Sequence, residues 1–266
     1  MSRTRQTPFT DPAEFSDNPR PVVALANDYP SGYEIAPHRH ARAQLVYASQ
    51  GVMTVTAAAG SWVVPPQRAV WMPAGAEHAV RVNRAIAMCS LYIRPDAAPR
   101  LPQSCRVVTV SALLRALILR AMSIPPLYDE AGPDGRILRV ILDELRALPS
   151  APLHLPRARD PRLARVTEAL RADPADARSL DAWARAAGAS PRTLARLFAK
   201  ETGLTFRAWR QRARLLHALV ELAAARKPVT SVAFEAGYNS PSAFIAAFKR
   251  EFGTTPARYF RDQAGA

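Results

Sequence analysis

The chain has 266 residues, of which 48% are hydrophobic and 22% are charged, and it carries a formal net charge of +14. This composition is typical of a folded protein with one or two domains and excludes disorder along the whole chain. Two cysteines, Cys89 and Cys105, are too few for a disulfide scaffold or a cysteine-based zinc finger. The sequence has neither a signal peptide nor the ~20-residue apolar run of a membrane span, so we expect a cytoplasmic protein with no membrane partner.

The positive charge is concentrated in the second half of the chain. Residues 151–266 carry a net charge of +10, whereas residues 1–150 carry only +4. A basic half of this size indicates a polyanionic partner, either nucleic acid or an acidic membrane surface. Because 33 of the 36 basic residues are arginine, an arginine-rich genome is a second explanation that composition does not separate from the first.

The first half consists of short apolar segments separated by turns. Turn signals rich in proline and glycine fall at residues 29–32, 49–51, 59–60 and 73–75. Many short strands with regular turns are typical of a β-sandwich or barrel. We predict an all-β domain with strands at residues 22–26, 44–48, 52–56, 61–64, 69–72, 79–82 and 88–93.

After Ser111 the apolar residues recur with a helical period. One apolar stripe lies within residues 113–118 and another within residues 137–145. Two helices with these stripes would either pack on the barrel or pair two chains in a homodimer. Residues 149–161 then hold four prolines without any period, which is typical of a stiff interdomain linker.

The last hundred residues contain an internal repeat. From Ser190 onward two segments align at an offset of 50 residues, with identities at 190/240, 191/241, 198/248, 201/251 and 203/253. In each copy a short helix ends at Gly188 or Gly237, because glycine tolerates the left-handed conformation there. Serine then caps a second helix that has proline at its first position. Two short helices joined by a tight turn form a helix-turn-helix unit.

A long helix at residues 205–225 is predicted between the two copies, with a supporting helix at 163–170 and a terminal helix from Thr255. This arrangement resembles the AraC/XylS family of transcriptional regulators over about residues 160–262. In that family the second helix of each unit enters the major groove of DNA, and the two units read successive grooves. The resemblance implies double-stranded DNA and RNA polymerase as partners.

The faces opposite the buried stripes of the two second helices are the predicted DNA-binding surface. Arginine is the usual bidentate reader of guanine, so we expect Arg192 and Arg196 to contact bases. The second copy has few polar residues on this face, and we expect it to hold mainly phosphate through Lys249 and Arg250. The predicted DNA-binding residues are Ser190, Arg192, Ala195, Arg196, Ser240, Ser242, Ile245, Ala246, Lys249 and Arg250. Further candidates for phosphate contact are Arg207, Arg210, Arg212, Arg214 and Arg258.

Three histidines stand out in the predicted barrel. His38 and His40 lie two residues apart on a predicted strand, so their imidazoles face the same way. With Gln44 and His78 they form the patterns His-x-His-x3-Gln and Pro-x-Gly-x2-His. These patterns resemble the two motifs of the cupin barrel. In metal-binding cupins, two histidines and a glutamate of the first motif join a histidine of the second.

Gln44 stands where those cupins have the glutamate. A neutral amide is a poorer metal ligand than a carboxylate, so the preferred interpretation is a metal-free effector pocket lined by His38, His40, Gln44 and His78. Two other interpretations stay open. The three histidines form a metal site, or they are structural residues whose hydrogen bonds are satisfied in the barrel interior. We expect no cofactor.

The combined prediction is a two-domain protein. An N-terminal all-β cupin-like barrel followed by helices spans residues 20–148, a linker spans 149–159, and an all-α domain with two helix-turn-helix units spans 160–262. Cupin-like sensor barrels precede such units in the AraC/XylS family, so the resemblance covers nearly the whole chain. It implies a sequence-specific DNA-binding regulator, not an enzyme, that responds to a small-molecule effector bound in the barrel. The alternative is a metal-dependent cupin enzyme, a dioxygenase or isomerase, with a helical appendage.

Overall fold

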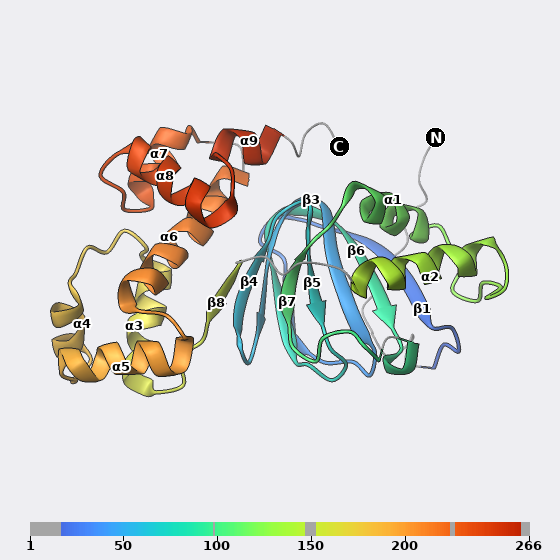
Figure 1. The fold of residues 1–266 in the computed structure, drawn as a ribbon, viewed down its shortest axis with the longest axis horizontal. Helices are drawn as coiled ribbons and strands as arrows, with labels where there is room; N and C mark the ends of the chain where they lie inside the picture. The colour runs from blue at the N-terminus through green and yellow to red at the C-terminus, as the bar shows by residue number, and fades with distance from the viewer. Residues whose placement is uncertain (1–16, 98, 147–152, 224–226, 262–266) are drawn as a thin grey trace. The chain divides into compact units, whose positions relative to one another are not determined.

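The computed structural model describes residues 17–97, 99–146, 153–223 and 227–261 (Figure 1). The chain forms two compact units, one of residues 1–57 with 64–151 and the other of residues 58–63 with 152–266. The first unit is rich in β-strands and the second in helices. This confirms the predicted class, an N-terminal all-β domain with helices followed by an all-α domain.

Two long antiparallel strands organise the first unit. β3 (Ala43–Ala57) and β6 (His78–Ile93) pair with each other along most of their length. The other edge of β6 pairs with β1 (Val22–Tyr29) and β2 (Glu34–His38). The other edge of β3 pairs with β5 (Arg68–Met72), which in turn pairs with β7 (Arg106–Thr109). Among the described strands no pairing joins β1 to β7, so the sheet is open rather than closed into a complete barrel.

Four of the predicted strands form only two strands in the structure. Residues 44–48 and 52–56 both lie in β3, and residues 79–82 and 88–93 both lie in β6. The predicted turn at residues 49–51 is instead an irregularity within β3, where the register with β6 shifts on both sides of Gln50. Gly51 has a φ of 77° there, and a Cβ atom on it would lie 2.2 Å from the carbonyl oxygen of Ala85. The glycine therefore marks a bulge with close backbone approach rather than a chain reversal.

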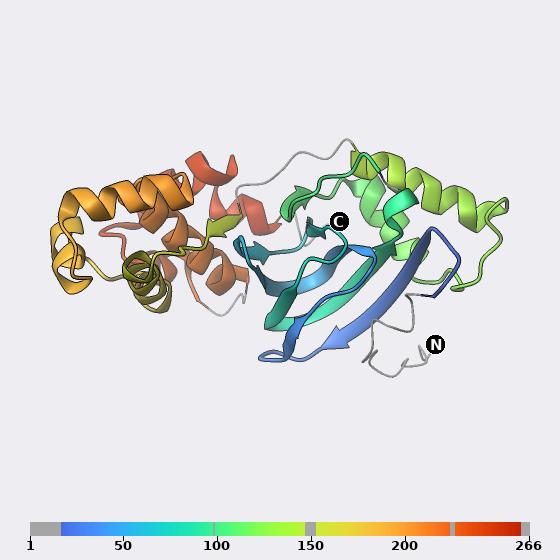
Figure 2. The same cartoon turned by 90° about the horizontal axis from the view of Figure 1, so that it is seen from below.

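Helices α1 (Ala112–Ala121) and α2 (Pro133–Arg146) cover one face of the sheet (Figures 1 and 2). Ser111 caps α1 by accepting a hydrogen bond from the amide of Leu114. The apolar stripe of α2 at residues 138, 141, 142 and 145 is buried against strand residues such as Leu45, Trp71 and Leu91. A single 3₁₀ turn, η2 (Pro95–Ala97), precedes β7.

The second unit contains seven helices among the described residues. They are α3 (Pro161–Ala172), α4 (Leu180–Ala186), α5 (Pro191–Thr202), α6 (Phe206–Ala223), α7 (Val229–Glu235), α8 (Pro241–Phe252) and α9 (Pro256–Arg261). The predicted central helix at residues 205–225 corresponds to α6, and its last predicted residues lie outside the described ones. No described helix is both long enough and apolar enough to span a membrane.

A small two-stranded element packs against one of these helices, α6. Residues 60–62 of β4 (Gly60–Val64) pair with β8 (His154–Pro156), and the ring of Trp62 stacks on His154 at 4.7 Å between centroids. The indole of Trp209 on α6 donates a hydrogen bond to the carbonyl of Pro156. Part of the predicted linker is thus a strand, while residues 149–152 lie outside the described ones. The linker boundaries stay a prediction.

Candidate functional site

The first candidate site consists of the exposed faces of α5 and α8, one on each helix. Both helices begin at a serine whose hydroxyl accepts a hydrogen bond from a backbone amide three residues on, 3.1 Å for Ser190 and 3.2 Å for Ser240. Both end at a glycine in the left-handed conformation, with φ of 68° at Gly203 and 81° at Gly253. The predicted caps are confirmed. Each cap sets the residue at which its helix begins or ends, because the hydrogen bond is local to that end of the helix.

The turn of each unit has the predicted left-handed glycine. Gly188 has a φ of 66° and Gly237 a φ of 79°. The next residue donates its amide five residues back, to Ala184 in the first unit and to Ala233 in the second. This hydrogen bond ends the first helix of each unit and directs the chain into the cap of the second.

The buried stripes of α5 and α8 leave the predicted face in solvent. Leu194, Phe198, Phe244 and Phe248 have no exposed surface. On the opposite face Arg192, Ala195, Arg196, Ser242, Ala246, Lys249 and Arg250 are exposed, whereas Ser240 and Ile245 are half-buried. The structure thus brings the predicted residues of each helix onto one side, and their contacts with DNA stay a prediction.

The two faces differ in where they carry charge. At the offset of 50 residues, Arg192 and Arg196 of α5 correspond to Ser242 and Ala246 of α8. Conversely, Lys249 and Arg250 of α8 correspond to Ala199 and Lys200 of α5, and both of these are exposed. The basic residues of α5 start in its first turn, at Arg192, whereas those of α8 lie only in its last turn, at Lys249 and Arg250. Sequence reasoning missed Lys200, although the repeat itself could have indicated it.

Three arginines of α6 have partners within the helical unit. Arg212 forms an ion pair of 2.9 Å with Glu251 on α8. Arg210 donates to the carbonyl of Arg178 at 2.9 Å, and Arg214 donates to the carbonyl of Pro174 at 2.8 Å. These contacts fasten α6 to α8 and to the loop between α3 and α4. The three side chains therefore have a structural role that the sequence prediction of phosphate contact did not include.

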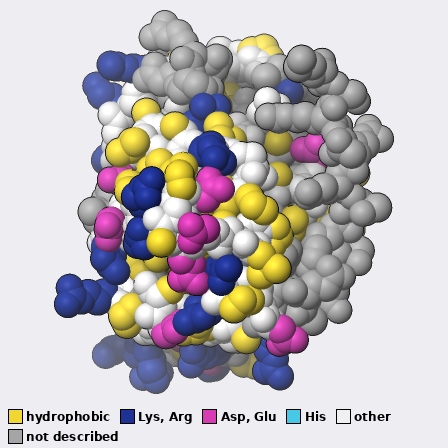
Figure 3. Space-filling view, turned by 90° about the vertical axis from the view of Figure 1, so that its right-hand side faces the viewer, with side chains coloured by type: hydrophobic (Ala, Val, Ile, Leu, Met, Phe, Trp, Pro, Cys, Tyr) yellow, Lys and Arg dark blue, Asp and Glu magenta, His cyan; other side chains and the backbone are white. Residues whose placement is uncertain are grey.

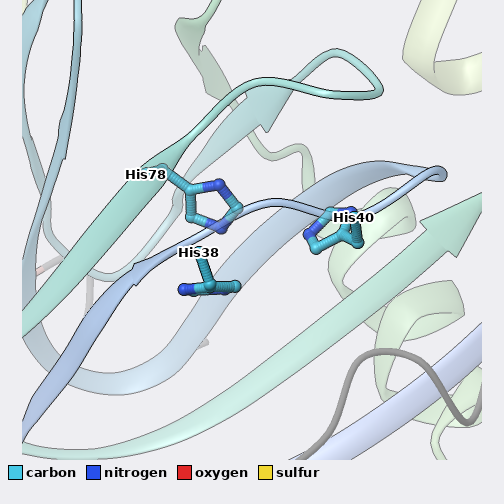
Figure 4. Close-up of side chains that lie close together, drawn as sticks. All are labelled: His38, His40 and His78. Atoms are coloured by element: carbon cyan, nitrogen blue, oxygen red, sulfur yellow. The ribbon is translucent and has the colours of Figure 1, made fainter.

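The second candidate site is a cluster of the three histidines in the first unit (Figure 4). His38 ends β2 and pairs in register with His78, the first residue of β6. His40 lies after β2, so the prediction that it shares a strand with His38 is wrong. The rings nevertheless gather, with centroids 4.3 Å apart for His38 and His78 and 5.3 Å apart for His40 and His78.

Hydrogen bonds to the backbone fix the protonated nitrogen of each ring. Nδ1 of each histidine lies within hydrogen-bond distance of a carbonyl oxygen two residues away, at 2.8 Å for His38, 2.5 Å for His40 and 2.9 Å for His78. A carbonyl only accepts, so Nδ1 carries the proton and Nε2 of each neutral ring holds a lone pair. Burial lowers the pKa of His78 to about 4 and also lowers the pKa of His40, which favours the neutral form of these two rings.

Gln44 links His40 to two hydroxyl groups of β6. Its Oε1 atom lies 3.0 Å from His40 Nε2, and its Nε2 atom lies 3.1 Å from Ser90 Oγ and 3.1 Å from the Tyr92 hydroxyl. Because Nε2 of the neutral His40 ring accepts, exchanging the two ends of this amide gives every contact one donor and one acceptor. Gln44 then donates to His40 and accepts from Ser90 and Tyr92. All four side chains are at most 8% exposed.

Arg42, which sequence reasoning missed, anchors the loop that carries His40. Its side chain is 3% exposed and donates to the carbonyl oxygens of Asn18 and Arg20. Arg20 in turn donates to the carbonyl of Tyr128 at 2.6 Å. The loop at the cluster is therefore connected to two segments that are distant in sequence, and such long-range partners leave no local signal in the chain.

The donor set of the cluster fits a transition-metal ion. One ring nitrogen from each histidine lies within 4.8 Å of the others. Imidazole nitrogens suit zinc, nickel, cobalt or iron, and ligand histidines commonly donate their second nitrogen to a carbonyl, as all three do here. Ligands at ~2.1 Å from a tetrahedral ion lie ~3.4 Å apart, so the cluster would contract on binding.

Comparisons with known proteins agree with both halves of the prediction. A family model described as a helix-turn-helix domain matches residues 183–262, and one described as an AraC-like ligand binding domain matches residues 20–142. The HTH-type transcriptional regulator NimR of Escherichia coli strain K12 is 39% identical over 222 residues, which cover 84% of this chain and 81% of that protein.

Other matches cover less of the chain or are less similar to it. The HTH-type transcriptional regulator RipA of Corynebacterium glutamicum is 35% identical over 134 residues, covering 50% of this chain and 38% of that protein. A crystal structure of ToxT from Vibrio cholerae O395 aligns with 92% of this chain and 99% of its own, at 10% identity and a TM-score of 0.40.

Proposed function

Since the chain belongs to the AraC family of transcriptional regulators, we propose that its two helix-turn-helix units divide the recognition of DNA between them. α5 reads base edges through Arg192 and Arg196, and α8 mainly holds the phosphate backbone. The observation that carries this proposal is the unequal placement of charge on two faces that the repeat makes equivalent.

The chemistry of each face supports its role. Arg192 and Arg196 are four residues apart, so their guanidinium groups project from one face of α5 and can each bind a guanine edge. α8 offers Ser242 in its first turn and Ile245 and Ala246 at its middle positions, and of these three only the serine can hydrogen-bond a base. Its cations lie in the last turn, where Lys249 and Arg250 suit phosphate oxygens.

We further propose that the effector binds at His38, His40, Gln44 and His78. These polar groups meet among buried side chains of the sheet, and a few convergent polar groups in an apolar setting are typical of small-molecule sites. An effector there regulates the protein only if it binds one arrangement of the chain better than another. The proposed role of the cluster is binding rather than catalysis, in contrast to the alternative of a cupin enzyme.

Other partners follow from the same proposal. A transcriptional regulator acts with RNA polymerase and in the cytoplasm, and we propose both for this chain. We also propose that the exposed faces of α1 and α2 pair two chains in a homodimer. Leu113 and Val140 are 55% and 44% exposed on these helices, and hydrophobic side chains lie among basic and acidic ones at this end of the first unit (Figure 3).

The proposed function is tested by selecting genomic DNA fragments with the purified full-length chain. We expect the recovered fragments to share a motif in which guanines are concentrated in one half-site, the one that α5 contacts. Recovery of fragments with no shared motif would contradict sequence-specific binding. A motif equally defined in both half-sites would contradict the division between α5 and α8.

A further inference from the structure

We propose that His38, His40 and His78 bind a divalent transition-metal ion through their Nε2 atoms, and that Gln44 competes with this ion for His40. The proposal rests on the effector-binding role proposed above, and it specifies the chemistry of the ligand. It also departs from the sequence prediction, which preferred a pocket without metal.

The arrangement of protons is the first argument. Because each Nδ1–H is directed at a backbone carbonyl, the three Nε2 atoms are all acceptors. One nitrogen of each ring lies within 4.8 Å of a nitrogen of each of the other two rings. A group that satisfies three convergent acceptors at once is a cation, and three neutral imidazoles are a common donor set for zinc, nickel or cobalt.

Gln44 supplies the second argument. Its amide occupies Nε2 of His40, whereas a bound ion needs that same lone pair. Contraction of the cluster to the ~3.4 Å spacing of metal ligands therefore breaks the contact between His40 and Gln44. The amide also contacts Ser90 and Tyr92 on β6, so its release changes the hydrogen bonds of the strand that begins at His78.

The absence of a carboxylate among these four side chains has a consequence for the ion. Three imidazoles and an amide leave the charge of a divalent ion uncompensated. The remaining coordination positions therefore favour a small anionic donor, such as a carboxylate, over a neutral one. The site would in this way combine a metal ion with an anionic molecule.

Metal content of the full-length chain tests the proposal. After dialysis against zinc, nickel or cobalt and removal of free metal, we expect inductively coupled plasma mass spectrometry to find about one ion per chain. The paired change His40→Gln with His78→Asn should abolish this content, and cobalt should give visible absorption bands that the pair lacks. His217→Gln, a change on α6 outside the cluster, is the matched control and should keep the full content.

Gln44→Glu keeps the test decisive if the paired variant fails to fold. A carboxylate at this position is a better ligand than an amide and balances charge, so we expect metal affinity to rise about tenfold or more. Lower affinity in Gln44→Glu, or a wild-type chain with no more metal than the folded paired variant, would overturn the proposal.

The same variants separate this inference from the proposed function. If the paired variant is folded and loses regulation in cells, but the wild-type chain binds no metal, the effector site stands and the metal proposal fails. If metal binds stoichiometrically but the folded paired variant regulates normally, the metal site stands and its role as the effector site fails.

Discussion

Arg212 on α6 and Glu251 on α8 form an ion pair of 2.9 Å in which both side chains are half-buried. The corresponding glutamate of the first repeat, Glu201, instead accepts hydrogen bonds from the amides of Arg159 and Asp160. The glutamate that recurs in the repeat therefore fastens the end of each second helix to a neighbouring segment. The architecture of the helical unit accounts for the recurrence of this glutamate.

Arg212→Ala should destabilise the helical unit. A charged hydrogen bond between half-buried groups contributes about 1–2 kcal/mol, and the variant also leaves Glu251 unpaired. Denaturant unfolding of the full chain measures this loss. Arg207→Ala is the matched control, because Arg207 is exposed on the same helix and should change the free energy of unfolding by less than ~0.5 kcal/mol. An unchanged unfolding midpoint in Arg212→Ala would show that the pair adds nothing to stability.

The two turn glycines should respond differently to alanine. Both have positive φ, so alanine at either position costs about 1–2 kcal/mol of strain. A Cβ atom at Gly188 would meet no heavy atom of the described chain within 4 Å, whereas at Gly237 it would lie 2.8 Å from Ala175 Cα and 2.8 Å from the guanidinium of Arg214. Overpacking adds about 1–3 kcal/mol there. Unfolding free energies should therefore fall further in Gly237→Ala, and equal losses would contradict the packing of this turn.

Local signals made the helical domain predictable. A cap, a proline at the first helical position and a glycine at the end act within a few residues, so Ser190 and Gly203 defined α5 from the sequence alone. The partners of Arg212 and Arg214 are about 40 residues away, and nothing in the local sequence indicates them. For this reason the sequence did not indicate that three arginines predicted as phosphate contacts have partners inside the protein.

The β-domain was less predictable because its strands are defined by distant partners. Gly51 gave a turn signal, but the pairing of β3 with β6 on both sides of it makes a bulge. The histidine cluster was predicted correctly as a group although the reason was partly wrong. His40 lies beyond β2 and reaches the cluster through its contacts with the backbone and Gln44, not through strand alternation.

Replacing His40 with Gln and His78 with Asn together should abolish or alter the response to effector in cells. The reason is that these rings supply two of the convergent polar groups of the proposed site. A promoter reporter measures the response, and a thermal melt of the purified variant measures folding. Normal regulation by a well-folded variant would contradict effector binding at this cluster.

Binding of the full-length chain to DNA should weaken steeply with salt. Each phosphate neutralised by arginine or lysine releases counterions, so log K should fall with log salt at a slope of about −0.9 per contact. Titrations at several salt concentrations give the slope, and Lys249→Ala should reduce it by about one contact. Affinity that is unchanged between low and moderate salt would contradict a phosphate-binding surface on the basic half.

The most direct test of the division between α5 and α8 compares Arg196→Ala with Lys249→Ala on the selected DNA site and on random DNA. Arg196→Ala should lower affinity for the selected site by ~1–3 kcal/mol and affect random DNA much less, because a base contact is lost. Lys249→Ala should lower affinity for both DNAs alike, because a phosphate contact is lost. An equal loss on both DNAs in Arg196→Ala would make Arg196 a phosphate contact and contradict base reading by α5.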